Sequence, residues 1–256
     1  MTFTVKEKIG QAIVNPRGIW RKLSIVIPIF NKWNFTKSCL KDLIRLPDDH
    51  EVIIIDNGSS DETNKELVPF CNELLGQNPN QCWIRCVQNT ENTFHSKACN
   101  QGYKMANGDN ILFLNNDVKV RQNHTDWTKV ITDACASTNG LVGPTMGQLD
   151  KDLNFVKEAN EQLTGNSYLG GWCIAAKKDV WKQLDVDGTD QIWNEEFPFY
   201  FNDTDLSFRA RKKQIPLTVV SLPDIVHFGK ISAAQINIPK LYKEGRQVFV
   251  KKWGNR

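Results

Sequence analysis

The 256-residue sequence has no long apolar run and no strong excess of charge of one sign. Its apolar stretches are far shorter than the roughly 20 residues that cross a bilayer, so we expect no transmembrane segment. The first residues lack the apolar centre of a signal peptide, and a cytoplasmic location is therefore expected. The 32 basic and 29 acidic residues are interspersed and leave a net charge of +3, which does not favour a nucleic-acid-binding protein.

The sequence also lacks a disulfide framework and two well-known nucleotide motifs. Its seven cysteines form an odd, scattered set without Cys-x-x-Cys spacing, so we expect reduced, structural thiols. No Gly-x-Gly-x-x-Gly follows the first expected strand, which excludes the dehydrogenase fingerprint. Residues 30–33 do not form the glycine- and basic-rich loop that a nucleotidyltransferase would need there. No repeat or low-complexity tract is present.

Short apolar runs instead alternate with helical spacing in the first half of the chain. The runs predict strands over residues 23–28, 51–56, 83–88 and 110–114. Helical spacing predicts helices over residues 33–46 and 63–75, and more weakly over 97–105. Alternating strands and helices are typical of a parallel sheet that is covered on both faces, so we predict an α/β fold.

The second half predicts that the sheet resumes after an inserted segment. A weak hairpin pattern over residues 148–156 precedes a stretch rich in glycine and tryptophan. The elements expected after it are strands over 172–176 and 217–221 and helices over 178–184, 203–213 and 239–253. The last helix is basic and amphipathic, and packing against the body of the protein is favoured over membrane anchoring.

Polar residues follow three of the expected strands at the point where each strand ends. They are Asn31 after the first, Asp56-Asn57-Gly58 after the second and Asn115-Asn116-Asp117 after the fourth. One such loop is an ordinary turn, but open α/β sheets bind ligands at the carboxyl ends of their strands. Three polar strand ends in one sheet therefore indicate a site.

Two carboxylates at these strand ends have chemistry that suits a nucleotide ligand. Asp117 follows an apolar strand, and one or two carboxylates with waters and phosphates suffice to hold Mg²⁺ or Mn²⁺. Asp56 is placed to accept hydrogen bonds from a base or a ribose, next to a helix start that favours anions. Ser59 and Glu62 predict a capping box for that helix.

A second acidic pair, Asp203 and Asp205, precedes an expected helix. Asp205 fits the helix cap better, which leaves Asp203 beside Phe199 and Tyr200, where an apolar wall raises a carboxyl pKa toward that of a general base. From spacing alone, structural and catalytic roles are evenly matched. His227 is one of four histidines, and a lone histidine is more often structural than a ligand.

Taken in order, these motifs resemble glycosyltransferase family 2, whose members share the GT-A nucleotide-sugar fold. Residues 24–31 are similar to the family's opening strand, and residues 55–61 are similar to its nucleotide-binding turn. Residues 92–109 resemble the stretch that leads to the metal motif, and residues 114–118 match that motif in its Asn-Asn-Asp form.

The later motifs continue the resemblance to about residue 232. Gly170-Gly171 is similar to the acceptor turn, residues 202–206 with Arg209 to the catalytic helix, and His227 with its neighbours to the closing segment. No single motif is specific, but the ordered set is.

The resemblance implies a single GT-A domain over residues 1–256 and an inverting, metal-dependent sugar transfer. In such a domain the mostly parallel, Rossmann-like sheet carries an inserted acceptor-side region. Residues 23–117 would form the nucleotide-sugar half, 118–232 the acceptor and catalytic half, and 233–256 a C-terminal helix. The implied roles are Asp56 on the base, Asp117 on Mn²⁺ or Mg²⁺, Asp203 as general base and His227 near the metal and the diphosphate.

The expected site residues fall into three sets. Donor contacts are expected from Pro28, Phe30, Asn31, Asp56, Asn57, Asn92, Lys97, Asn115, Asn116 and Asp117. Acceptor contacts are expected from Gly171, Trp172, Tyr200 and Asp203, and metal contacts from Asp117 and His227.

Two residues depart from the family pattern. Phe94 stands where the family usually has glycine, which suggests a reshaped loop on the sugar side with His95 or Lys97 near the donor. Asn202 stands where the family usually has glutamate, which leaves Asp203 as the only carboxylate of that pair.

The expected partners are a nucleotide diphosphate sugar as donor and a hydroxyl acceptor, by family a lipid-linked or cell-surface glycan. Trp172, Trp193, Phe199 and Tyr200 are candidates for a saccharide-stacking platform, although aromatics also fill cores. Nucleic acid and protein acceptors stay open, as do the donor nucleotide and the oligomeric state. Two other functions also stay open, namely a non-catalytic sugar-binding module of the same fold and a nucleotidyltransferase.

Overall fold

The computed structural model describes residues 12–13, 22–46, 50–77, 82–121, 127–229 and 238–254. Its centre is an eight-stranded sheet with the strand order β1-β4-β3-β2-β5-β11-β7-β12. These strands are β1 (Ala12–Ile13), β2 (Leu23–Ile29), β3 (His50–Asp56), β4 (Cys82–Gln88), β5 (Asn110–Leu114), β7 (Leu141–Gly143), β11 (Cys173–Lys177) and β12 (Leu217–Val219). Strands β4, β3, β2 and β5 are parallel, whereas β11 runs antiparallel to both β5 and β7.

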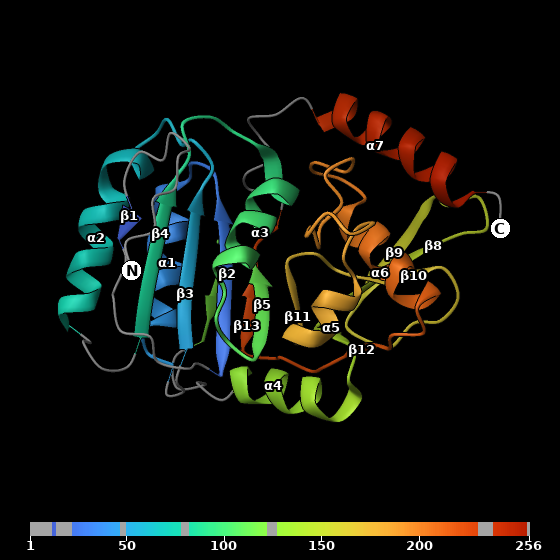
Figure 1. Ribbon diagram of the computed structural model, residues 1–256, viewed down its shortest axis with the longest axis horizontal. Coiled ribbons are helices and arrows are strands. Elements are labelled where there is room, and N and C mark those ends of the chain that lie inside the picture. The colour runs from blue at the N-terminus through green and yellow to red at the C-terminus, as the bar shows by residue number, and fades with distance from the viewer. Residues whose placement is uncertain are drawn as a thin grey trace.

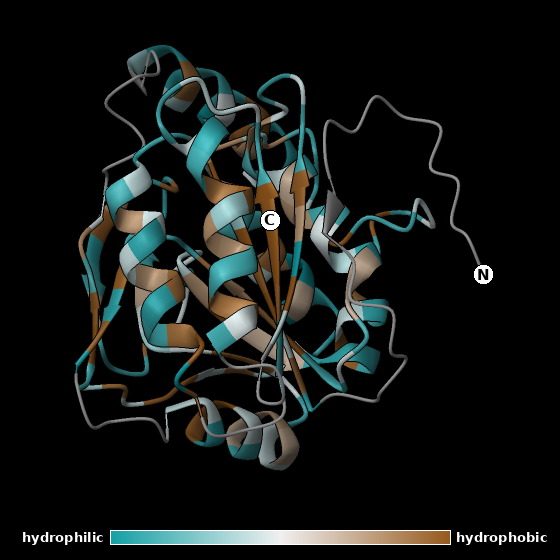
Figure 2. Ribbon diagram, turned by 90° about the vertical axis from the view of Figure 1, so that its left-hand side faces the viewer, coloured by the Kyte–Doolittle hydropathy of each residue, from teal (hydrophilic) through white to brown (hydrophobic). Residues whose placement is uncertain are grey.

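Helices cover both faces of this sheet, as Figure 1 shows. One face carries α1 (Trp33–Leu43), α2 (Thr63–Gln77) and α4 (Trp127–Thr138), and the other carries α3 (Phe94–Met105), α5 (Lys178–Gln183) and α6 (Asn202–Lys212). The strands are apolar on both sides because each face packs against helices, and Figure 2 shows these brown strands behind helices with hydrophilic outer faces. The predicted α/β architecture, a mostly parallel sheet covered by helices on both faces, is therefore confirmed.

Two small sheets and a last helix lie beside the central sheet and complete the second half of the chain. A three-stranded antiparallel sheet has the order β10-β8-β9, and a two-stranded pair joins β13 to β6. Their bounds are β6 (Val118–Val120), β8 (Met146–Leu149), β9 (Phe155–Ala159), β10 (Ser167–Leu169) and β13 (Ile225–His227). Helix α7 (Ile238–Trp253) packs its Phe249 against Phe201 and its Trp253 against Phe208 of α6.

Most expected elements form within a few residues of the predicted bounds, and three differences are informative. Helix α3 begins at Phe94 rather than at residue 97, and α4 was not expected. The hairpin expected over residues 148–156 is formed by β8 and β9, which extend beyond it on both sides. Across the described part of the chain, no helix is both long enough and apolar enough to cross a membrane.

Candidate active site

A cavity of about 310 Å³ opens at the carboxyl ends of β2 and β5, where the two halves of the chain meet. Its volume falls at the lower end of the range for small-molecule sites. Twelve of the expected site residues line it: Pro28, Phe30, Asn57, Asn92, Asn115, Asn116, Asp117, Gly171, Trp172, Tyr200, Asp203 and His227. Residues far apart in the sequence thus converge on one cavity.

Asp117 and His227 come together because β6 and β13 pair next to the end of β5. His227 is opposite Val118 in this ladder, and the Phe228 N–H donates to the Asp117 carbonyl at 3.0 Å. The His227 ring stacks on Trp172 with centroids 4.6 Å apart, and the Trp172 indole N–H donates to Thr145 Oγ1. The imidazole is thereby held with its Nε2 atom 3.2 Å from Asp117 Oδ1.

The two facing atoms fit a divalent cation. Asp117 Oδ1 and His227 Nε2 are both buried, and apart from their 3.2 Å contact with each other neither has a polar partner within the described part of the chain. Buried polar atoms are normally satisfied, so this pair calls for a further group. Two ligands in adjacent octahedral positions at about 2.1 Å from Mg²⁺ are about 3 Å apart, close to the observed separation.

Asp117 and His227 alone are too few ligands for a divalent cation, so oxygen atoms of waters or of a substrate would have to complete such a site. Among the described residues, no group of three or more His, Cys, Asp or Glu side chains could hold a metal ion. Mg²⁺ is usually bound by one or two protein ligands together with waters and substrate phosphates. The Asp117–His227 pair meets that minimum.

Asp203 lies on another part of the cavity wall, in the first turn of α6. Its Oδ2 accepts the Gly171 N–H at 2.9 Å, and its Oδ1 accepts the Thr204 N–H at 2.7 Å. Burial raises the pKa of the Asp203 carboxyl, an effect that outweighs the lowering by these hydrogen bonds, and the nearby Glu158 adds to the increase. A carboxylate with a raised pKa is better suited to accept a proton than an ordinary exposed one.

Gly171 and Trp172 connect Asp203 to the Asp117–His227 pair. The Gly171 N–H holds Asp203, and the next residue, Trp172, stacks on the His227 ring that faces Asp117. A Cβ atom at position 171 would lie 3.0 Å from Asp203 Cβ, so a larger residue here would displace the Asp203 side chain. The two polar parts of the cavity are therefore held by one continuous segment.

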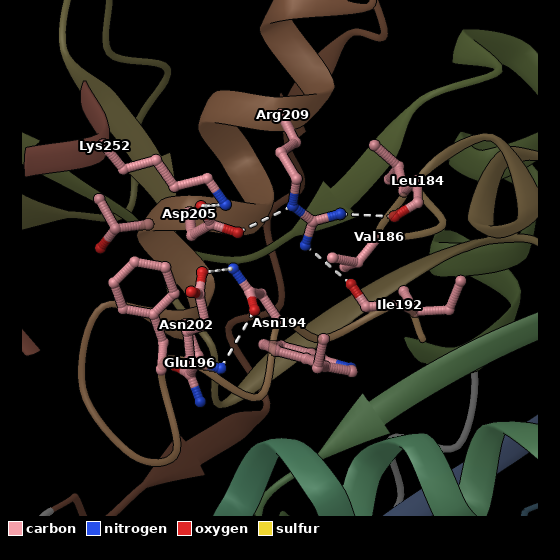
Figure 3. Close-up of polar contacts among 12 residues, drawn as sticks. Leu184, Val186, Ile192, Asn194, Glu196, Asn202, Asp205, Arg209 and Lys252 are labelled. Carbon is pink, nitrogen blue, oxygen red and sulfur yellow. Dashed lines mark hydrogen bonds and ion pairs between the residues drawn. The ribbon is translucent and has the colours of Figure 1, made fainter. Parts of the chain in front are cut away.

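The prediction that Asp205 caps α6 is wrong. Helix α6 begins at Asn202, its N-cap residue Phe201 makes no side-chain cap, and Asp205 lies within the first turn. The fully buried Asp205 carboxylate instead accepts hydrogen bonds from Arg209 Nε at 2.8 Å and Trp253 Nε1 at 2.9 Å, and pairs with Lys252 Nζ at 3.0 Å. Figure 3 shows that the Arg209 guanidinium also donates hydrogen bonds to the carbonyls of Leu184 and Ile192. Asp205 thus joins α6 to α7 by an ion-pair network.

Three expected donor residues do not line the cavity. Asp56 is buried, and its two oxygens accept from the Ser59 N–H and from Gln88 Nε2, each at 3.0 Å. Asn31 Oδ1 accepts the N–H groups of Ser60 and Asp61, and Lys97 is exposed on α3. Their contacts with a donor stay predictions.

The predicted capping box at Ser59 and Glu62 is also wrong. The Thr63 N–H at the start of α2 donates to Asp61 Oδ1 at 2.9 Å, so Asp61 acts as the cap. Ser59 Oγ accepts the Asn31 N–H at 2.7 Å instead. The turn after β3 is therefore fastened to the end of β2.

The loop before α3 carries strain next to the cavity. Phe94 has a φ of 65°, a region in which glycine is at home and a bulky residue costs about 1–3 kcal/mol. Asn57 holds this loop, because its Nδ2 donates to Asn92 Oδ1 and to the Phe94 carbonyl at 2.9 and 3.0 Å. The left-handed backbone explains why glycine is the usual residue at this position in the resembled family.

The sequence did not identify every residue of the cavity wall. Glu158 on β9, Tyr168 on β10 and Gly170 also line the cavity, and no motif marked the first two. Trp193, by contrast, is fully buried and packs against Phe113 and His95, so its prediction as part of a stacking platform is wrong.

Comparisons with known proteins agree with this geometry. The family model described as Glycosyl transferase family 2 matches residues 24–175. A mannosyltransferase from Pyrobaculum calidifontis, solved in complex with GDP-Man and Mn²⁺, superimposes with a TM-score of 0.56 at 13% identity over 81% of this chain. TarS 1-349 from S. aureus, solved in complex with UDP-GlcNAc, superimposes with a TM-score of 0.59 at 15% identity over 90% of this chain.

This chain spans 56% of the length of the first of these structures and 66% of the second. No curated protein matches it by sequence. Identities this low establish the fold and not the substrate. Because the family model matches more than half of the residues, the chain belongs to glycosyl transferase family 2, and the superimposed structures show that it has the GT-A fold.

Proposed function

We propose that this chain transfers a sugar, with inversion, from a nucleoside diphosphate donor to a hydroxyl acceptor, with Asp203 as the general base. One observation carries the proposal. A partly buried carboxylate with a raised pKa, Asp203, and the Asp117–His227 pair, which lacks other polar partners within the described residues, line the same cavity at the carboxyl ends of the sheet. Proton acceptance and cation binding are the two functions that such a transfer needs.

In the proposed reaction, the acceptor hydroxyl gives its proton to Asp203 while its oxygen forms a bond to the anomeric carbon. The bond from that carbon to the diphosphate breaks, and the electron pair leaves with the nucleoside diphosphate. Because attack and departure occur on opposite faces of the sugar, the configuration inverts. A base that activates the nucleophile directly requires no covalent enzyme intermediate.

Asp117 and His227 would hold Mn²⁺ or Mg²⁺ for this reaction. Such a bound cation supplies Lewis-acid stabilisation of the negative charge on the leaving diphosphate, worth several kcal/mol. The stacking of His227 on Trp172 keeps its Nε2 atom aimed at Asp117 and so preserves the ligand geometry. The Mn²⁺ named with the Pyrobaculum mannosyltransferase supports Mn²⁺ as the first ion to test.

The donor and the acceptor are proposed by chemical class. GDP-Man and UDP-GlcNAc, which are named with the two superimposed structures, are the first donors to test here. For the acceptor, Phe199 and Tyr200 line the cavity with their rings 5.0 Å apart and offer an apolar face for a saccharide. A glycan acceptor is therefore favoured, and a nucleic-acid acceptor is a separate arm of the screen.

The test is a screen of nucleotide sugars for binding and for slow hydrolysis, with and without Mn²⁺. A thermal shift that needs both donor and Mn²⁺, together with hydrolysis of that donor, is the expected result. Donor binding without any hydrolysis or transfer would instead identify a non-catalytic binding module. Release of pyrophosphate from a nucleoside triphosphate and a sugar phosphate would identify a nucleotidyltransferase.

A further inference from the structure

A row of hydrogen bonds runs from the start of α6 through Asn202 and His95 to Asn115. The Asp203 N–H donates to Asn202 Oδ1 at 2.8 Å, and Asn202 Nδ2 is 3.0 Å from His95 Nδ1. At the other end of the row the His95 ring interacts with the side chain of Asn115, which directly follows β5. The row therefore connects the base-bearing helix with the strand end that carries Asp117.

The direction of each hydrogen bond in this row is fixed by its first member. A backbone N–H can only donate, so the Asn202 atom that faces Asp203 must be the amide oxygen. The Asn202 amide nitrogen then faces His95, and His95 Nδ1 must accept, which leaves the imidazole proton on Nε2. That proton is the one available to the Asn115 side chain.

A neighbouring contact independently supports this direction. Ser96 Oγ gives its proton to the Phe197 carbonyl at 2.5 Å, so Ser96 Oγ can only accept from Asn202 Nδ2, which is 3.4 Å away. Both contacts made by Asn202 Nδ2 are thus consistent with a donor.

The surroundings of His95 keep the ring neutral and fixed. The ring packs edge-on against Trp193 with centroids 5.3 Å apart, and Cys99 Sγ is 3.6 Å from Nδ1 and 3.7 Å from Nε2. Burial lowers the pKa of His95 to about 4, although the hydrogen bond with Asn115 opposes this decrease. A neutral ring is what the row requires, because a charged ring has no acceptor for Asn202.

We propose that His95, held as its Nε2–H tautomer by Asn202, is a positioning residue that joins the Asn115 strand end to α6 and so places the Asp203 carboxylate. This proposal rests on the proposed function for its effect on activity, whereas the tautomer itself is a property of the folded chain. His95 also lines the cavity, but the role proposed for it acts through Asn202, and measurements of turnover and binding separate this role from direct contact with the donor.

The same row explains the asparagine at position 202. A carboxylate there would only accept hydrogen bonds and would direct its oxygen at the unprotonated His95 Nδ1. Two acceptors facing each other repel unless the ring takes up a proton or changes tautomer. Asn202 is thus matched to a neutral His95. The asparagine that replaces the family's usual glutamate is therefore explained by the presence of His95.

The first test is the tautomer of His95, measured from the imidazole ¹⁵N chemical shifts at neutral pH. The His95→Gln spectrum identifies the signals by their loss. We expect Nε2–H in the wild type, and protonation or a switch to Nδ1–H in Asn202→Asp. An Nδ1–H or charged His95 in the wild type, or an unchanged ring in Asn202→Asp, would overturn the proposal whatever the activity of the protein.

The second test compares two His95 substitutions by Mn²⁺-dependent turnover of the nucleotide sugar that the screen identifies. His95→Phe keeps a ring but removes both hydrogen bonds, and displacement of a catalytic group by about 1 Å costs about 10²-fold in rate. His95→Gln offers an acceptor and a donor and should retain most of the turnover. Lys104→Gln, on the exposed side of the same helix, is the matched control and should behave as wild type.

The ratio of turnover to binding separates positioning from direct contact. We expect His95→Phe to lower turnover at saturating donor while the donor-induced thermal shift stays as in the wild type. An equal loss of donor affinity would show that His95 touches the donor, and unchanged turnover would show that the row is not needed; either result refutes a positioning role. If the wild type turns over no nucleotide sugar, the proposed function fails, and the ¹⁵N measurement alone decides the tautomer.

Discussion

The two carboxylates at the start of α6 should respond to the same substitution in opposite ways. Asp205 is fully buried, and its partners Arg209, Trp253 and Lys252 all donate to it. An asparagine in its place keeps the size but presents an NH₂ group to these donors, so most of the network is lost. Asp205→Asn should therefore destabilise the fold.

The magnitude follows from the burial of the network. Removing one partner of a buried ion pair costs about 3–5 kcal/mol, because the other charge stays buried without compensation. For a chain of this size, each kcal/mol lowers the melting temperature by about 2–4 °C, so a decrease of about 6–20 °C is expected. Loss of a simple helix cap would cost only about 0.5–2 kcal/mol.

Asp203→Asn is the matched variant two residues away. Its amide oxygen can still accept one of the N–H groups of Gly171 and Thr204 while the other loses its acceptor, so we expect a loss of about 1–3 kcal/mol, less than that of Asp205→Asn. Its sugar transfer, in contrast, should decrease by a factor of about 10²–10⁴.

Thermal melts of both variants, followed by turnover assays on the folded fraction, distinguish the two roles. Asp205→Asn should have a lower melting temperature than the wild type. At temperatures below its melting transition, its sugar transfer should be proportional to the fraction of folded protein. A stable, inactive Asp205→Asn together with an active Asp203→Asn would refute the assignment of these two carboxylates.

Three further predictions concern the metal pair, the turn after β3 and the pH dependence. Asp117→Ala should keep the fold but abolish Mn²⁺-dependent donor binding by calorimetry, and donor affinity that still depends on Mn²⁺ would contradict the metal assignment. Asp56→Ala leaves the Ser59 N–H without its acceptor and Gln88 Nε2 with only the Asn64 carbonyl, so thermal melts should show a loss of about 1–3 kcal/mol. Titration of the same variant should show weaker donor binding with turnover at saturation maintained. Because burial raises the pKa of Asp203, kcat should decrease on acidification around a pKa above the ordinary value of 3.8, and an acidic limb below that value would exclude Asp203 as the titrating base. The same raised pKa means that the Asp203 contribution to stability is fully present below the unfolded pKa and is lost as the pH rises through the folded pKa. Between these two pKa values, pH-dependent melts should show Asp203→Asn becoming more stable relative to wild type as the pH rises.

The sequence predicts the strands and the cavity residues well where local chemistry determines them. The strands before Asp56 and Asp117 are short apolar runs, and their polar ends lie at one edge of the sheet because parallel strands share an orientation. His227 and Gly171 were placed by resemblance, and the structure brings both to the cavity wall.

The predictions for the cap of α6 and for the start of α3 differ from the structure for the same reason, which is contact between residues far apart in the sequence. The choice between Asp203 and Asp205 as the cap depended on where α6 starts and on what faces each side chain. Two of the three partners of Asp205, Lys252 and Trp253, come from a helix 47 or more residues later in the chain. Helix α3 begins early because Asn57, from another strand end, holds Phe94 in a strained conformation. Local periodicity cannot report such distant contacts.

The measurement that tests the central claim most directly is single-turnover transfer by wild type and Asp203→Asn, both saturated with Mn²⁺ and the donor found in the screen. We predict that Asp203→Asn binds donor and metal with wild-type affinity, as calorimetry would show, and transfers sugar about 10²–10⁴-fold more slowly. Transfer at the wild-type rate by the folded, donor-saturated variant would contradict the account, because no other residue has been assigned to accept the proton.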